Sequence, residues 1–121
     1  MATGEARTAI GEANGYPYPP PGNHIGRPGN RRSSLAVVGI ERRSAEPGAV
    51  LAGEVVLVDL STSSTGDVRR LAHHRSEGVY SDDDGYWANP FAAMSPTGSK
   101  VVFSSDWGSD SVNTYLIDLT R

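Results

Sequence analysis

The sequence predicts an all-β, antiparallel fold of two similar sheets, preceded by an irregular N-terminal arm rich in proline and glycine. Three observations lead to this prediction. Short apolar, β-branched runs alternate with polar turn segments after residue 33. Glycine and proline are abundant, at 14 and 8 of the 121 residues. No apolar pattern of helical spacing continues beyond about two turns.

Residues 1–33 form the predicted arm. The run 16–22 is Tyr-Pro-Tyr-Pro-Pro-Pro-Gly, and each proline fixes φ and lacks an N–H group. This composition favours extended or irregular chain. The first residues contain no apolar run, so no signal peptide is expected here. No stretch approaches the ~18 apolar residues of a membrane span, so no membrane partner is expected.

The next 88 positions, residues 34–121, divide into two predicted units, 34–74 and 87–121, joined by a loop. Apolar, β-branched runs predict a sheet of three or four strands in each unit. They cover 35–40, 53–60 and 68–73 in the first unit, and 89–94, 100–105 and 113–119 in the second. Between the first two strands of the second unit, the Ser95-Pro96-Thr97-Gly98 segment predicts a tight turn.

The two units repeat one another. Residues 56–61 align with 115–120, an offset of 59 (115 minus 56), and both segments contain Asp-Leu. Residues 35–38 correspond to 100–103. Two such units expose unpaired strand edges, which need a cover. We expect the arm, a second copy of the chain or a partner sheet to supply that cover, so a homo-oligomer is one predicted state.

The amino-acid composition limits the kinds of partner and of chemistry that we expect for this protein. The net charge of −3 disfavours nucleic-acid binding, which needs a basic face. Five arginines at 27, 31, 32, 42 and 43 are locally basic, and they are interpreted either as solvated loop residues or as an anion-binding patch. The chain has no cysteine, which excludes disulfides, thiolate nucleophiles and cysteine-ligated zinc.

The motif Pro-x4-Ser-Pro-x-Gly-x4-Phe-x-Ser-Asp over 90–106, followed by Tyr-x-x-Asp-Leu over 115–119, resembles the repeat of TolB-like (WD40-like) bacterial β-propellers. Segments 17–25, 70–76, 86–88 and 104–108 further resemble the C-terminal end of bacterial propeller proteins distantly similar to oligogalacturonate lyases. This resemblance covers about residues 16–121. It implies that each sheet is a propeller blade, and that the protein is periplasmic or secreted.

The strongest candidates for chemistry are His24, His73 and His74, with the neighbouring Arg75. Resemblance to the lyases implies a histidine-rich manganese site, where a divalent cation polarises a uronate carboxylate for β-elimination. His73 and His74 are adjacent, so on a regular strand they point to opposite faces. The alternative is that these imidazoles are structural and bonded to loop carbonyls.

Two further groups are candidate binding residues. Asp82 and Asp84, before Gly85, predict either a calcium loop or a solvated acidic turn. Trp87, Trp107 and Tyr86, together with Tyr80, predict either an aromatic platform for a sugar ring or core packing. Asp106 is expected to cap its own turn through backbone amides.

The leading functional hypothesis is a propeller-type interaction or carbohydrate-binding module that associates with copies of itself or with a partner blade. The first alternative is a metal-assisted lyase or hydrolase acting on acidic polysaccharide, with manganese or calcium as the cation. The second is a truncated fragment of a longer propeller. The sequence does not decide whether the protein is an enzyme.

Overall fold

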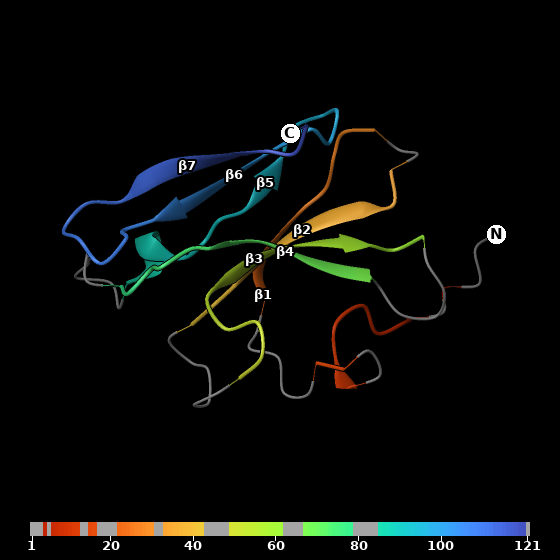
Figure 1. Ribbon diagram of the computed structural model, residues 1–121, viewed down its shortest axis with the longest axis horizontal. Helices are drawn as coiled ribbons and strands as arrows, with labels where there is room; N and C mark the ends of the chain where they lie inside the picture. The colour runs from red at the N-terminus through yellow and green to blue at the C-terminus, as the bar shows by residue number, and fades with distance from the viewer. Residues whose placement is uncertain are drawn as a thin grey trace.

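A computed structural model describes residues 4, 6–12, 15–16, 22–30, 33–42, 49–61, 67–78 and 85–120. It confirms an all-β fold with antiparallel sheets: sheet A has the order β1-β2-β3-β4, and sheet B has the order β5-β6-β7 (Figure 1). The described residues contain 3-10 helix but no α-helix. No helix among them is long and apolar enough to cross a membrane. The elements are β1 (Gly22–Gly26), β2 (Leu35–Ile40), β3 (Glu54–Asp59), β4 (Asp67–His73), the 3-10 helix η2 (Tyr86–Ala88), β5 (Ala93–Met94), β6 (Lys100–Ser105) and β7 (Asn113–Asp118).

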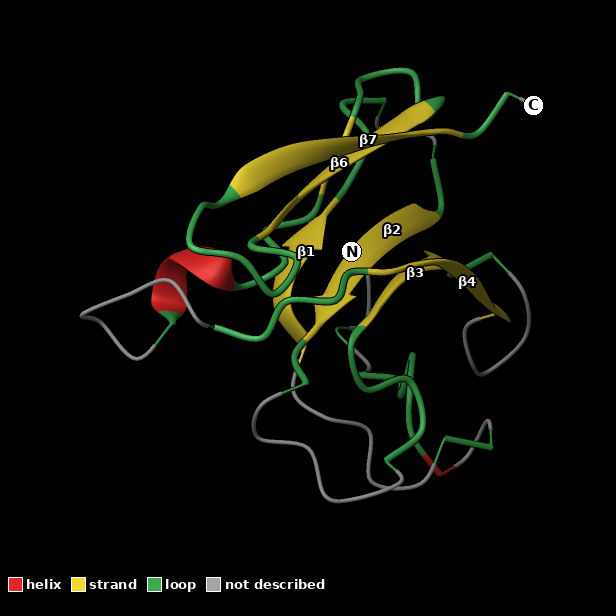
Figure 2. Ribbon diagram, turned by 60° about the vertical axis from the view of Figure 1, so that its left-hand side comes forward, coloured by secondary structure: helices red, strands yellow, loops and turns green. Residues whose placement is uncertain are grey.

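The two sheets lie one over the other (Figures 1 and 2). Strands β2 and β3, in the middle of sheet A, are buried on both faces. Burial on both faces explains why β2 and β3 are continuous apolar runs and do not alternate with polar residues. The core between the sheets contains Val37, Val55, Ala92, Val101 and Phe103. The core on the other face of sheet A contains Val38, Ile40, Leu51, Val56 and Val58, against which Ala9, Ile10 and Tyr16 of the N-terminal segment pack.

Residues 22–26 correct the prediction of an irregular arm, because they form β1 at the edge of sheet A. Ile25 pairs with Val38 of β2, and the register shifts between Gly22 and His24. Without β1, the backbone groups at this edge of β2 would lack a strand partner. Long-range pairing therefore overrides the local preference of a glycine-rich segment. The preceding polyproline residues, 17–21, lie outside the described residues.

The strand predicted at 89–94 is shorter than expected. Only Ala93 and Met94 pair with β6, and residues 89–92 are irregular. Pro90 has no N–H group to donate to a ladder, and its carbonyl is in close contact with Gly39 of β2. A Cβ at Gly39 would overlap the Pro90 carbonyl oxygen. The irregular segment before β5 thus approaches β2 closely at a position where only glycine fits.

The predicted repeat is visible in the strand register. Leu35 lies opposite Asp59 in sheet A, as Lys100 lies opposite Asp118 in sheet B. Each hairpin ends in the same way: the Leu60 N–H donates to the Ser34 carbonyl at 3.0 Å, and the Leu119 N–H donates to the Ser99 carbonyl at 2.9 Å. The two Asp-Leu segments therefore occupy equivalent positions, as the alignment of the sequence predicts.

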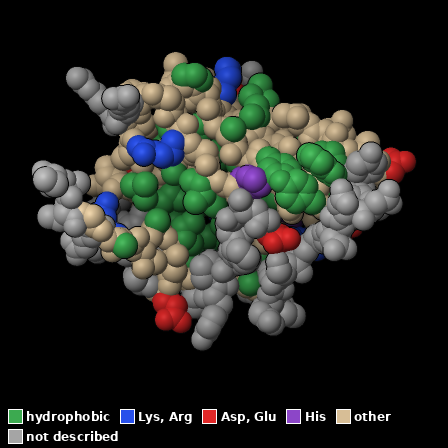
Figure 3. Space-filling model, turned by 180° about the vertical axis from the view of Figure 1, so that it is seen from behind, with side chains coloured by type: hydrophobic (Ala, Val, Ile, Leu, Met, Phe, Trp, Pro, Cys, Tyr) green, Lys and Arg blue, Asp and Glu red, His purple; other side chains and the backbone are tan. Residues whose placement is uncertain are grey.

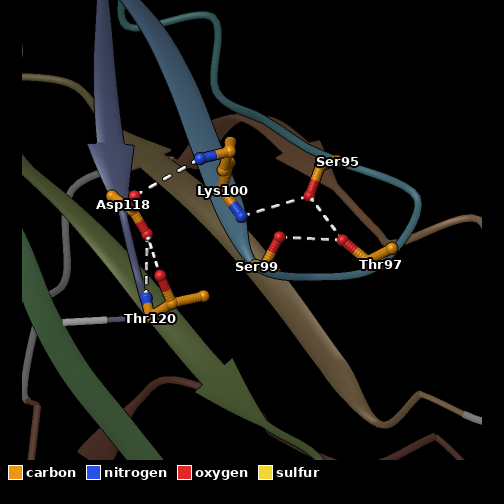
Figure 4. A network of polar contacts seen from close by, with 6 residues as sticks. All are labelled: Ser95, Thr97, Ser99, Lys100, Asp118 and Thr120. Atoms are coloured by element: carbon orange, nitrogen blue, oxygen red, sulfur yellow. Dashed lines mark hydrogen bonds and ion pairs between the residues drawn. The ribbon is translucent and has the colours of Figure 1, made fainter.

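Both repeat aspartates are held by short hydrogen bonds that stabilise the ionised carboxylate. Asp118 Oδ1 accepts the Thr120 hydroxyl at 2.6 Å and the Thr120 N–H at 3.0 Å, while Oδ2 lies 3.3 Å from Lys100 Nζ (Figure 4). Asp59 Oδ1 accepts the Ser34 hydroxyl at 2.6 Å and the Ser61 N–H at 2.9 Å. These bonds lower the pKa of each carboxyl to about 2.

The turn between β5 and β6 has the predicted conformation. The Gly98 N–H donates to the Ser95 carbonyl at 2.9 Å, and Gly98 has φ 75°. Ser95 Oγ also accepts the Lys100 N–H at 3.1 Å, which joins the two ends of the turn (Figure 4). Proline at the second position and glycine in the left-handed region suit this geometry.

We predict that Gly39→Ala lowers the free energy of unfolding by about 1–3 kcal/mol or more, because the new methyl group would push the Pro90 backbone away from β2. Urea denaturation measures the loss. Gly29→Ala is the matched control, since its Cβ would lie 3.5 Å from Pro96, an ordinary contact. Equal stability of the two variants would contradict the close approach of Pro90 to β2.

Candidate functional site

The segment that leaves sheet A after β4 is held between the sheets by His74. This side chain is only 1% exposed. Its Nε2–H donates to the Ile40 carbonyl at 2.9 Å, and its Nδ1 accepts the Ser76 N–H at 3.0 Å. These bonds define the neutral tautomer, and burial lowers the pKa of the imidazole below its usual range. His74 is therefore bonded in the structural manner that the sequence offered as the alternative to a metal ligand.

Ser105 and Asp106, at the end of β6, fasten this segment to sheet B. The Ser105 hydroxyl donates to the His74 carbonyl at 2.6 Å. Asp106 Oδ1 accepts the Glu77 N–H at 3.0 Å and the Gly108 N–H at 3.2 Å. Both side chains are fully buried. The expected capping of the turn by Asp106 is confirmed, and the same oxygen also holds the segment after β4.

The turn that follows presents Trp107 in a rare backbone conformation. Trp107 and Gly108 have φ 51° and 70°, and the Ser109 N–H donates to the Asp106 carbonyl at 2.8 Å. Positive φ at both central residues is typical of a type I′ turn, where asparagine or glycine is usual. Arg75 also has positive φ, at 54°. Bulky residues in this region cost about 1–2 kcal/mol each, and such residues cluster at functional sites.

A pocket of about 270 Å³ lies between these two residues, lined by Arg42, His73, Arg75, Glu77 and Trp107. The Arg75 guanidinium carbon lies 5.5 Å from the centre of the Trp107 ring, within cation–π range. Arg42 and Glu77 form an exposed ion pair at 3.9 Å. Two arginines against one glutamate leave one positive charge in excess, so the pocket favours anions.

Gly53 provides the space in which the His73 ring lies. A Cβ at Gly53 would approach His73 Cε1 to 3.2 Å and the Arg42 side chain to 3.5 Å. Gly53 also has φ 78°, where glycine is favoured. The glycine before β3 therefore shapes the pocket without contributing a side chain.

The residues of this pocket suit a ligand with an apolar face and an anionic group. The Trp107 ring is 46% exposed and is supported by Tyr115, with ring centroids 4.9 Å apart. An aromatic face can stack on the C–H face of a sugar ring. Arginine binds carboxylates with two parallel hydrogen bonds, and imidazole adds a further donor or acceptor.

His24 lies away from this pocket. The register places His24 opposite Gly39, Gly39 opposite Val55 and Val55 opposite Ala72, so these four residues share the face of sheet A toward sheet B. His73 follows Ala72 and lies opposite Glu54, on the other face. The strand register therefore separates His24 from His73. In the described ranges, no three His, Cys, Asp or Glu residues are grouped to hold a metal.

The predicted aromatic platform is divided into two groups. Tyr86, Trp87, Phe91 and His24 form a chain of ring contacts with centroid distances of 4.0 to 5.4 Å. Tyr86 and Trp87 are 51% and 55% exposed. Figure 3 shows a histidine beside exposed hydrophobic side chains on one face of the molecule. Trp107 belongs to the other group, with Phe103 and Tyr115.

The remaining predicted residues have separate outcomes. His73, Arg75 and Trp107 come together in the pocket. Asp82, Asp84 and Tyr80 lie outside the described residues, so the calcium loop stays a prediction. Sequence reasoning missed Glu77 as a pocket residue, and treated Arg42 only as one of a basic group. Neither residue belongs to a local sequence motif. Glu77 is held at the pocket by the hydrogen bond from its N–H to Asp106 Oδ1.

The fold and the pocket define a two-sheet antiparallel β protein with an arginine-, histidine- and tryptophan-lined site. Comparisons of the chain with protein-family models, with curated proteins and with solved structures found no match.

We predict that His74→Ala costs about 2–4 kcal/mol of unfolding free energy, because it removes two buried hydrogen bonds and leaves a cavity. His73→Ala, at an exposed position, should change stability by less than about 0.5 kcal/mol. Urea denaturation measures both variants, and equal losses would contradict a structural role for His74.

The same histidine makes stability depend on pH. Its pKa is lowered in the folded state, so the unfolded chain takes up a proton more readily. Stability should therefore fall as the pH falls below about 6.5, the pKa of an unperturbed histidine. Denaturation between pH 5 and pH 8 should show this slope in the unchanged protein and in His73→Ala, but weaker in His74→Ala.

Proposed function

We propose that this chain is a blade-type β module that binds an acidic saccharide in the pocket between Arg75 and Trp107. The observation that carries the proposal is the convergence of two arginines, a histidine and an exposed tryptophan around one pocket. Self-association with further copies is the second part of the proposal.

The sheet arrangement supports the blade interpretation. Sheet A is an antiparallel meander of four strands in chain order, and sheet B repeats the register of its β2–β3 hairpin. The first strands of the two sheets are in contact, since a Cβ on Gly26 of β1 would lie 2.8 Å from Ala93 Cα of β5. Adjacent propeller blades have this arrangement, with their innermost strands near a common axis.

The pocket favours an acidic sugar over a neutral one for an electrostatic reason. A uronate carboxylate would meet Arg75 and Arg42, while the C–H face of the sugar ring would stack on Trp107. The Arg42–Glu77 pair is exposed, with both side chains more than half accessible, so its attraction is weak. A ligand carboxylate can therefore replace Glu77 as the partner of Arg42 at low cost.

The alternative of a metal-assisted lyase or hydrolase has no specific support in the described residues. His24 and His73 lie on opposite faces of sheet A, and both ring nitrogens of His74 are bonded to backbone groups. A manganese or calcium site would need ligands from outside the described residues, Asp82 and Asp84 among them. It stays a prediction of the sequence alone.

Calorimetric titration with oligogalacturonate, and with a neutral oligosaccharide of the same length, tests the proposal. We expect the acidic ligand to bind at least tenfold more tightly, a difference of about 1.4 kcal/mol. Trp107→Ala and Arg75→Ala should each weaken acidic binding by about tenfold or more. Higher salt should also weaken it.

Trp87→Ala is the matched control, since Trp87 is at least as exposed as Trp107 but does not line the pocket. Its affinity should equal that of the unchanged protein. Binding lost in Trp87→Ala but kept in Trp107→Ala would move the ligand to the other aromatic group. Circular dichroism of each variant separates lost binding from lost folding.

A further inference from the structure

Strand β7 is an edge strand of sheet B (Figure 1). The register of its pairing with β6 defines which backbone groups point to the open side. The Leu119 N–H donates to Ser99 on the β6 side. Backbone groups alternate sides along an antiparallel strand, so Ile117 and Tyr115 also face β6. Thr114, Leu116 and Asp118 therefore direct their N–H and C=O groups to the open side.

The repeat shows what this edge is built to accept. Leu116 is the equivalent of Leu57 in β3, and Leu57 lies opposite Arg69 of β4. Sheet A thus has a fourth strand where sheet B has none among the described residues. Strand β7 contains no proline or lysine, two residues that commonly block edge pairing, and its one charged residue is Asp118, at its end. Its edge is regular along all six residues.

We propose that two copies of this chain pair through β7, antiparallel, about a twofold axis at Leu116. An axis perpendicular to the sheet keeps each side chain on its own face, so residues that meet must share a face. The outward backbone groups and the shared faces allow only registers that pair Thr114, Leu116 and Asp118 among themselves, and of these only the register centred on Leu116 pairs all three. Leu116 meets the partner's Leu116, and Thr114 meets the partner's Asp118.

This register is self-complementary, which is the reason for choosing a second copy as the occupant. Ala93, Val102 and Leu116 lie opposite one another on adjacent strands and form an apolar row across sheet B. Leu116 is 62% exposed and ends this row at the open edge. In the dimer this row continues into the partner's sheet. Each Asp118 faces a neutral threonine and keeps its contact with Lys100, so no like charges are opposed.

The inference rests on the self-association part of the proposed function and is independent of the saccharide pocket. Trp107 lies in the β6–β7 turn, outside the paired strand. Saccharide binding and dimer formation can therefore be measured separately on the same variants.

Sedimentation velocity over a range of concentrations tests the pairing. The unchanged chain should sediment as a dimer at high concentration, and Leu116→Lys should weaken dimerisation at least tenfold by placing like charges at the axis. Val102→Lys is the matched control. It adds the same charge to the same face, but one strand inside the sheet, so edge pairing predicts that its dimer persists.

Mixing the Leu116→Lys and Leu116→Glu proteins should restore a dimer containing one copy of each, because opposite charges then meet at the axis. A monomer at every concentration would overturn the inference, as would a dimer that Leu116→Lys leaves intact. Loss of the dimer in both Leu116→Lys and Val102→Lys would also overturn it, and would indicate face-to-face stacking of sheet B. Circular dichroism of each variant shows whether it is folded, so the result on dimer formation does not depend on whether the saccharide proposal holds.

Discussion

The middle strands of sheet A, β2 and β3, are buried on both faces, and the rest of the structure depends on that constraint. Strands β2 and β3 carry apolar side chains toward both sides, so the sheet needs two covers. Sheet B covers one face, and the segment containing Ala9, Ile10 and Tyr16 covers the other. Among the described residues, sheet B is covered on its inner face, and Val102 and Leu116 on its outer face are accessible.

The candidate site lies where the chain crosses from one sheet to the other. The segment 74–77 must pass the rim of the sheet pair, and its backbone groups need partners there. His74, Ser105 and Asp106 supply those partners from buried positions. The bonds that join the sheets therefore also hold Arg75 and Trp107 opposite each other. Stability and the shape of the pocket depend on the same few hydrogen bonds.

The two units have the same strand register, but their strands have different neighbours. Asp59 and Asp118 close equivalent hairpins, and both have a pKa of about 2. Beyond them the units differ, because β3 is followed by β4 in its sheet whereas β7 is an edge. Among the described residues, the second unit of the repeat has no equivalent of β4, so β7 has an open edge of known register, and this edge defines the proposed dimer.

The sequence by itself determined the all-β class, the two units, the Ser95–Gly98 turn and the capping role of Asp106, because each depends on local periodicity or on neighbouring turn residues. Only the tertiary structure decided that residues 22–26 form β1, that Gly39 must be a glycine, and that His24 is separated from His73. It also brought Arg42 and Glu77 to Trp107. These features depend on contacts between residues distant in sequence, and local preferences do not encode such contacts.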